Sequence, residues 1–243
     1  MTRFFVDSSD LNKETFSLRG ENAAHAKVLR LKVSEEIIAC DGAGNAKRCV
    51  INQADGGNYL VKPLEQVQNT SEPKIRASIY MAFPKADKLE HVIQKATELG
   101  AFEIVAFPSA RCVSKPDEKS LKKKQERWQK IASSAAEQSG RDRIPEIIVL
   151  SSFQQALQRA MAADKAVLFY ENEQAVTLRM ALEEGSFSSI SLLTGPEGGL
   201  EESEVQKARE LGFSVCTLGS RILRCETAPL CALSAVMYAT GEF

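Results

Sequence analysis

The stretch Ser191–Leu200, SLLTGPEGGL, ends an apolar run and continues into a loop with three glycines and one proline within five positions. Residues 190–194 have the length and apolar character of a buried strand, and the loop begins at Gly195. Glycine adopts positive φ angles without steric cost and lets a backbone approach a ligand more closely than any side chain permits. We therefore expect a strand that ends in a ligand-binding loop.

A second loop of special composition follows one helix–strand unit later. The stretch Leu218–Ala228, LGSRILRCETA, places two arginines beside the apolar Ile222 and Leu223. In an open α/β sheet, ligands bind where loops leave the carboxyl ends of strands, and both loops occupy such positions. The two loops therefore predict one pocket with backbone groups and apolar walls, next to a place where negative charge is stabilised.

Around these loops, residues 73–243 alternate apolar runs with helical periods. This alternation is the signature of an α/β domain, and six buried strands with crossover helices predict a largely parallel sheet covered on both faces. The expected strands are 77–83, 102–107, 145–150, 166–170, 190–194 and 213–218, with helices near 89–99, 119–138 and 176–182 and others beginning near 153, 202 and 227.

Residues 1–72 have a different texture and predict a separate domain, with a polar linker at 70–73. Tight turns separate several short strands, notably at 41–45 and 55–58. This pattern fits a small β-barrel, a class that often binds nucleic acid. The expected strands are 3–6, 15–18, 36–40, 46–51 and 58–61, with one helix near 21–30.

Composition is that of an ordinary globular protein of 243 residues, 44% hydrophobic and 26% charged. The N-terminus lacks the apolar segment of a signal peptide and no window is apolar enough to span a membrane, so we expect a cytoplasmic location without membrane contact. Six cysteines form no C-x-x-C pair, and only two histidines accompany them. Reduced thiols and no metal site are the expected result.

Charge is unevenly distributed although the net charge is only −1. Residues 111–143 contain ten basic against five acidic side chains, whereas 171–210 contain three against nine. The basic segment is either a solvated helix face or a footprint for phosphates. In the acidic segment, four glutamates crowd the glycine-rich loop and the start of the next helix and would repel a polyphosphate: Glu197, Glu201, Glu202 and Glu204. No phosphate-binding fingerprint is present. A ligand without phosphates is preferred.

Several motifs resemble the SPOUT class of S-adenosylmethionine-dependent RNA methyltransferases, and the RsmE family in particular. They are 194–200 (TGPEGGL), 218–224 (LGSRILR) and 226–228 (ETA), with 85–90, 94–100, 127–132 and 136–141, and with 25–30 in the first domain. The resemblance implies an N-terminal PUA-like barrel and a C-terminal domain with a trefoil knot that holds the cofactor. It also implies a homodimer that methylates N3 of one uridine in the decoding region of 16S ribosomal RNA, within the small ribosomal subunit.

The resemblance also implies which residues bind S-adenosylmethionine, with the adenine on Leu193, Leu218, Ile222 and Leu223. Arg224 is the candidate catalytic residue because a fixed cation stabilises the charge that spreads over two uracil oxygens. Its alternative role is a salt bridge to Glu197 or Glu226. We identify no general base, and solvent can take the proton. The expected cofactor-binding residues are Leu193, Thr194, Gly195, Pro196, Glu197, Gly198, Gly199, Leu218, Gly219, Ile222, Leu223 and Arg224.

A target base must be turned out of folded RNA, so a binding surface outside the pocket is expected. The candidate RNA contacts are Lys85, Lys88, Lys95, Arg141 and Arg143, with Arg3, His25, Lys27 and Arg30 in the barrel. Two positions depart from the family pattern: Glu201 stands where Ser or Thr usually caps a helix, and Cys225 stands where Thr is common.

Three alternatives stay open. A noncatalytic RNA-binding ribosome-assembly factor needs only the basic helix and the barrel. A nucleotide-dependent enzyme with a doubly wound sheet fits the strand–helix alternation but lacks the phosphate fingerprints. A methyltransferase of the same superfamily could act on another RNA nucleotide.

Overall fold

The computed structural model describes residues 1–67, 71–113 and 118–243, which form two compact units. One unit contains 1–72 together with 136–144, and the other contains 73–135 together with 145–243. The sequence had placed 136–144 in the second domain. Backbone hydrogen bonds account for the difference, because the N–H of Gly44 donates to the carbonyl of Asp142 (3.2 Å) and the N–H of Ile144 donates to the carbonyl of Gly42 (3.0 Å).

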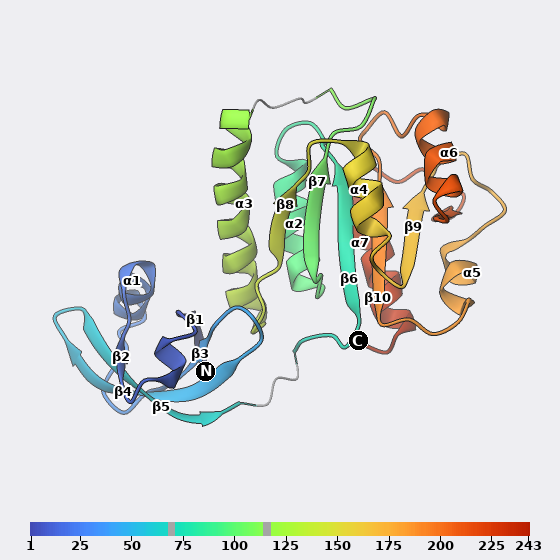
Figure 1. Ribbon diagram of the computed structural model, residues 1–243. Coiled ribbons are helices and arrows are strands. Elements are labelled where there is room, and N and C mark those ends of the chain that lie inside the picture. The colour runs from blue at the N-terminus through green and yellow to red at the C-terminus, as the bar shows by residue number, and fades with distance from the viewer. Residues whose placement is uncertain (68–70, 114–117) are drawn as a thin grey trace. The chain divides into compact units, whose positions relative to one another are not determined.

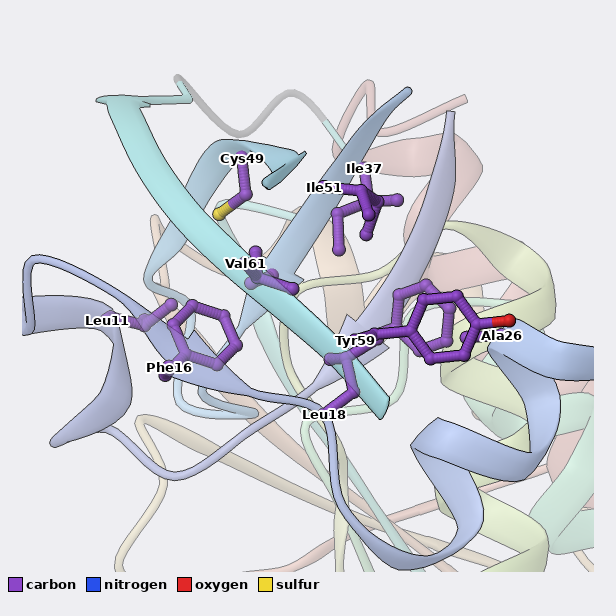
Figure 2. Packing of buried hydrophobic residues seen from close by; sticks show 11 residues of the cluster. Leu11, Phe16, Leu18, Ala26, Ile37, Cys49, Ile51, Tyr59 and Val61 are labelled. Carbon is purple, nitrogen blue, oxygen red and sulfur yellow. The ribbon is translucent and has the colours of Figure 1, made fainter. Parts of the chain in front are cut away.

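The first unit is built on a mixed sheet with strand order β1-β3-β4-β5-β2. β1 runs parallel to β3, and the other neighbours are antiparallel. Figure 2 shows side chains such as Phe16, Ile51 and Val61 in the hydrophobic core of this unit. The elements are β1 (Thr2–Phe5), η1 (Asp10–Asn12), β2 (Phe16–Ser17), α1 (Gly20–Val28), β3 (Glu36–Cys40), β4 (Ala46–Asp55) and β5 (Asn58–Gln66).

A two-residue turn joins β4 to β5. Asp55 pairs with Asn58 across the turn, and Gly56 and Gly57 between them have φ angles of 55° and 95°. Positive φ at both central positions matches the twist of the flanking strands and favours glycine. The turn predicted at 55–58 is confirmed.

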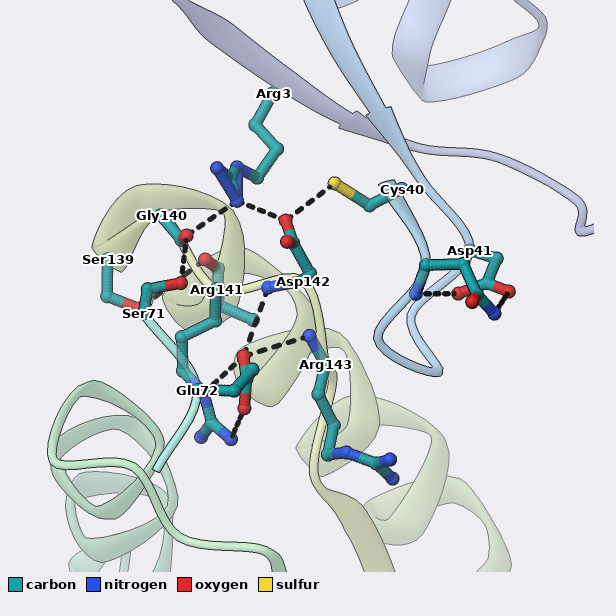
Figure 3. A network of polar contacts seen from close by, with 12 residues as sticks. Arg3, Cys40, Asp41, Ser71, Glu72, Ser139, Gly140, Arg141, Asp142 and Arg143 are labelled. Atoms are coloured by element: carbon teal, nitrogen blue, oxygen red, sulfur yellow. Dashed lines mark hydrogen bonds and ion pairs between the residues drawn. The ribbon is translucent and has the colours of Figure 1, made fainter. Parts of the chain in front are cut away.

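A cluster of polar side chains holds the segment 140–144 in the first unit (Figure 3). The Glu72 carboxylate accepts hydrogen bonds from the guanidinium of Arg141 (2.7 Å) and from the backbone N–H groups of Asp142 (3.0 Å) and Arg143 (3.1 Å). The Arg3 guanidinium forms an ion pair with the Asp142 carboxylate. One carboxylate therefore caps the turn at 141–143, and a second ion pair anchors it to β1.

This cluster engages Arg3 and Arg141, two of the candidate RNA contacts. The Arg141 side chain is only 3% exposed and the Arg3 side chain 15%. Removing one partner of a buried ion pair leaves an uncompensated charge, which costs about 3–5 kcal/mol. Both guanidinium groups are engaged by carboxylates of their own unit, which gives them a structural role, and their contact with RNA stays a prediction.

The second unit is an α/β domain whose described strands form a parallel sheet in the order β11-β9-β10-β6-β7-β8. In Figure 1, α4 lies in front of this sheet, and α2 and α7 lie behind it. The elements are β6 (Arg76–Ala82), α2 (Lys88–Glu98), β7 (Glu103–Phe107), α3 (Glu118–Ser139), β8 (Glu146–Val149), α4 (Phe153–Ala160), β9 (Lys165–Phe169), α5 (Leu178–Glu183), β10 (Ser189–Thr194), α6 (Glu202–Glu210), β11 (Ser214–Cys216) and α7 (Thr227–Ala239).

The inner strands are buried along almost their whole length, as their continuous apolar runs predicted. On α2, the buried residues Leu89, Val92, Ile93 and Ala96 recur at helical spacing and form the face that packs inward. The predicted α/β domain with a parallel sheet is confirmed, and the trefoil knot stays a prediction. Among the described helices, none has the length and apolar character needed to cross a bilayer.

Strand order brings three loops to one edge of the sheet. β9 lies between β10 and β11, with Leu168 in register with both Leu193 and Val215. Because these strands are parallel, the loops that follow Phe169, Thr194 and Cys216 leave the sheet at the same carboxyl edge.

Candidate functional site

A cavity of ≈ 1040 Å³ opens among these three loops. The loop after β10 contributes 194–199, and the segment after β11 contributes 217–225. The loop after β9 contributes Phe169, Tyr170 and Glu171, which the sequence analysis did not select. Loops that meet at the carboxyl edge of a parallel sheet form a common place for ligand binding.

Close packing explains the glycines of the first loop. A Cβ on Gly199 would lie 2.0 Å from the Glu171 Oε1 atom, and a Cβ on Gly195 would lie 3.1 Å from the carbonyl carbon of Gly199. Gly199 also has a φ of 67°. Only glycine fits this combination of space and backbone angle, so the loop lines the cavity with backbone atoms.

The far end of the first loop is held by a buried carboxylate. Glu204, in the first turn of α6, accepts hydrogen bonds from the backbone N–H groups of Glu201 (3.0 Å) and Ala110 (2.9 Å). Arg111 donates from its guanidinium to the carbonyl of Gly198 (3.0 Å). The segment after β7 therefore supports the loop from outside the cavity. Glu201 and Glu204 form a capping box, in which the Glu201 side chain accepts the N–H of Glu204, as a Ser or Thr at position 201 would, and the Glu204 side chain accepts the N–H of Glu201.

The second loop presents its side chains outward. Ile222 is 86% exposed, which is unusual for a large apolar side chain, and Arg224 is also exposed. The Arg224 carbonyl accepts the N–H groups of Thr227 (2.8 Å) and Ala228 (3.0 Å), which fixes its backbone at the start of α7. Within the described part of the chain, the Arg224 guanidinium forms no ion pair, contrary to the alternative of a bridge to Glu197 or Glu226.

Lys88 takes the place of Arg224 as the partner of both carboxylates. Its Nζ atom lies 3.0 Å from a Glu197 oxygen and 3.2 Å from a Glu226 oxygen. Glu197 belongs to the first loop and Glu226 follows the second, so one ammonium group joins the two. The backbone N–H of Lys85 adds a third bond, to Glu197 (3.0 Å).

The pKa values of this group keep all three side chains charged. The hydrogen bond to Glu197 is the largest cause that raises the pKa of Lys88. Partial burial raises the pKa of Glu197, but its own backbone N–H, Lys88 and the Lys85 N–H together lower it below its usual value. The pKa of Glu226 is also lowered, first by its own backbone N–H and then by Cys225 and Lys88. The two ion pairs therefore persist across the neutral pH range.

Cys225 lies beside this group as an inert thiol. Burial and a hydrogen bond from its thiol to Glu226 (3.2 Å) raise the pKa of Cys225 to about 12. A thiol with so high a pKa carries almost no thiolate near neutral pH, so it is a poor nucleophile.

Eleven of the twelve expected cofactor-binding residues line the cavity. The exception is Leu193, which is fully buried in β10 and belongs to the core beneath the cavity. A strand covered on both faces buries consecutive residues on opposite sides, so an apolar residue at its end need not face a ligand. Lining residues that the sequence did not assign to the cofactor include Lys88, which was expected to contact RNA, and Tyr170, Glu171, Thr217 and Ser220. Residues 169–171 lie at the end of a buried strand, and this position is the sequence feature that could have identified Tyr170 and Glu171 as lining residues.

The expected RNA contacts separate into engaged and exposed side chains. The Lys88 ammonium group binds two carboxylates at the cavity and its side chain is 29% exposed, and its contact with RNA stays a prediction. The lysine side chain at position 95 pairs with Glu98 (2.9 Å). The candidate RNA contacts that are exposed are Lys27 and Arg30 in the first unit and Lys85 in the second.

Two other candidate RNA contacts, His25 and Arg143, have partners within the first unit. His25 lies 3.0 Å from the Glu137 carboxylate, which leaves its ring 41% exposed. Arg143 donates from its guanidinium to the carbonyl of Ala43 (3.1 Å) and is only partly exposed. Both are accounted for by local structure, and their contact with RNA stays a prediction.

Two family models match the chain. The model of the RNA methyltransferase domain matches residues 70–237, and the model of the RNA methyltransferase PUA domain matches residues 18–64. The first match covers most of the α/β unit, including every loop of the cavity. The second covers most of the sheet of the first unit.

Full-length relatives agree with these matches. Ribosomal RNA small subunit methyltransferase E of Bacillus subtilis is 41% identical over 251 residues, covering 99% of this chain and 97% of the relative. The crystal structure of the protein of that name from Neisseria gonorrhoeae, bound to S-adenosyl methionine, has a TM-score of 0.86 at 30% identity and covers 98% of both chains. A methyltransferase structure from Legionella pneumophila, also with bound cofactor, has a TM-score of 0.86 at 26% identity and 98% coverage of both. The chain therefore belongs to the RNA methyltransferase family, among the proteins named ribosomal RNA small subunit methyltransferase E.

Proposed function

We propose that this protein transfers a methyl group from S-adenosylmethionine to N3 of one uridine in the decoding region of 16S ribosomal RNA. The observation that carries the proposal is the cavity at the carboxyl edge of the sheet, built from glycine backbone, apolar side chains and an arginine that no described carboxylate engages. Its substrate would be the small ribosomal subunit in the cytoplasm. The names of the relatives and the cofactor bound in two similar structures support the assignment.

The cavity suits S-adenosylmethionine in size and chemistry. Its ≈ 1040 Å³ lies at the upper end of the range of about 300–1,000 Å³ for ligand sites. Leu218, Ile222 and Leu223 supply apolar walls for the adenine, and a bound ring would cover the exposed Ile222. The Glu171 carboxylate, packed against Gly199, would attract the cationic end of the ligand.

Arg224 is the residue that we assign to the chemical step. When bound, S-adenosylmethionine supplies a methyl group on a positively charged sulfur, and the group passes to N3 as the N3–carbon bond forms and the carbon–sulfur bond breaks. The N3 proton leaves to solvent, and the charge that develops on the uracil spreads over its two carbonyl oxygens. The Arg224 guanidinium, which no described carboxylate engages, would stabilise this charge.

A homodimer is the second part of the proposal. Residues 227–240 contain no charged side chain, so α7 is apolar on all sides. Such a helix is normally buried all round, yet Tyr238 is 79% exposed and Cys231 is exposed. A second copy of the chain packed on this face would cover both residues by a symmetric contact.

The identity of the product tests the proposed function. Small ribosomal subunits that lack base methylation are incubated with the protein and S-adenosylmethionine, and their nucleosides are analysed by mass spectrometry. We expect N3-methyluridine. A different methylated nucleoside would show that the target is another nucleotide. No methylation despite cofactor binding would favour the noncatalytic assembly factor.

Replacing Arg224 should separate catalysis from cofactor binding. We expect Arg224→Ala to lower the rate of methyl transfer by about 100-fold or more, because a preorganised charge that acts on the transition state is lost. The affinity for S-adenosylmethionine, measured by calorimetry, should change little. The control is Arg221→Ala, which removes a cation from the same loop. An unchanged rate in Arg224→Ala, or an equal loss in both variants, would remove Arg224 from the catalytic role.

The oligomeric state tests the role of α7. Sedimentation equilibrium at micromolar concentration should give twice the chain mass of 26.7 kDa. Tyr238→Glu should shift the protein toward the monomer, because it places a charge in the apolar contact. Leu211→Glu, at an exposed position outside α7, should leave the dimer intact. A monomeric wild-type protein would refute the dimer.

A further inference from the structure

One face of α3 carries basic side chains that the site does not use. Between Lys119 and Lys130 the helix contains six basic residues and one acidic residue, Glu126. Lys119, Lys122 and Lys123 are exposed and make no ion pair with any described residue. We call these three residues the lysine face. At 100° per residue they lie on one side of the helix, opposite the buried Trp128.

The orientation of this face is fixed by the packing of α3. Trp128, Ala132 and Ala135 are buried on the inner side. The Gln125 side chain donates to the carbonyl of Ile147 (2.8 Å), and the Gln129 side chain accepts from the N–H of the same residue (3.0 Å). These bonds join the helix to the edge strand β8, so the lysine face cannot turn inward.

Local stability does not explain the lysine face. Lys119 lies three and four residues before Lys122 and Lys123, and like charges at these spacings destabilise a helix by about 0.2–0.5 kcal/mol per pair. Lys119 also lies in the first turn of α3, where the helix dipole disfavours cations. Glu126 lies on the same side of the helix, four residues after Lys122 and three after Lys123, but forms no ion pair with either lysine among the described residues. Three lysines against one glutamate leave this face positively charged. A polyanion bound to this face would relieve both unfavourable terms.

The lysine face lies toward the same edge of the sheet as the cavity. α3 follows β7 in the chain and begins near the carboxyl edge of the parallel sheet (Figure 1). In the segment between them, Arg111 contacts the cavity loop through the carbonyl of Gly198. An RNA strand that delivers a base to the cavity could therefore continue toward the start of α3.

We propose that Lys119, Lys122 and Lys123 bind phosphates of the ribosomal RNA that flanks the target base. This inference rests on the proposed function for the identity of the RNA. The contacts are electrostatic and would position the strand without reading its sequence. Their effect should appear in RNA affinity and in its salt dependence, and it should not appear in cofactor affinity.

The test compares two triple variants of the full-length protein. Lys119→Gln, Lys122→Gln and Lys123→Gln together remove the charge, whereas Lys→Arg at the same three positions keeps it. Equilibrium binding to unmethylated small subunits is measured at several salt concentrations, and methyl transfer is measured in parallel. Circular dichroism and calorimetry with S-adenosylmethionine verify that the fold and the cofactor site are intact.

We expect the glutamine variant to bind subunits about tenfold more weakly near 0.1 M salt. The slope of log affinity against log salt should fall by about two, since each phosphate contact contributes about 0.7 on a single strand. KM for subunits should rise by a similar factor, with kcat within about twofold. The arginine variant should behave as the wild type.

If the glutamine and arginine variants bind subunits with equal affinity and equal salt slope, the proposal that the lysine face binds RNA is wrong. Subunit binding is read without catalysis, so the two proposals fail separately. If the wild type binds subunits but does not methylate them, the proposed function fails, and a difference between the variants would still support the lysine face.

Discussion

The two ion pairs of Lys88 are the constraint on which the cavity depends. Its ammonium group joins Glu197 in the loop after β10 to Glu226 at the start of α7, across a sheet in which β9 separates β10 from β11. Glycine-rich loops lose more conformational freedom on ordering than other segments do, so their geometry must be fixed from outside. Lys88 supplies this from α2, and Glu204 fixes the other end of the first loop.

The same pairing decides the role of Arg224. Among the described residues, the cations that line the cavity are Lys88, Arg221 and Arg224, and Lys88 engages both Glu197 and Glu226. Arg224, which no described carboxylate engages, can then act on charge that develops in a substrate. The pairing also sets the pH range of the site. Because the pKa values of both glutamates are lowered, the ion pairs weaken only as pH falls through those lowered values, and the raised pKa of Lys88 preserves them on the alkaline side.

The structural features that the sequence predicted correctly are those that depend on local chemistry. Buried apolar runs identified the strands of the parallel sheet, and Gly56–Gly57 identified the hairpin turn of the first unit. The glycines of 195–199 and the apolar residues of 218–223 identified two of the three cavity loops. Their adjacency followed from the general rule that parallel strands share a carboxyl edge.

Other features depend on contacts that no spacing encodes. Lys88, Arg3 and Arg141 have the composition of surface cations, and only the fold shows that carboxylates far away in the chain engage them. The third loop, at 169–171, lines the cavity because the strand order places β9 between β10 and β11. Segment 136–144 joins the first unit through backbone bonds to residues 42–44 and through side-chain contacts with Arg3 and Glu72, all far away in the chain. Leu193 had the character of a ligand wall, but the sheet buries it.

The most direct test of this account is the affinity for S-adenosylmethionine, measured by calorimetry, when Lys88 is replaced. Lys88→Met should weaken binding by about tenfold, since the two ion pairs that hold the loops in place are lost. Lys88→Arg should restore most of the affinity, and Lys85→Met should leave it unchanged because position 85 contributes only its backbone N–H. Wild-type affinity in Lys88→Met would show that the cavity does not depend on this residue and would contradict the account.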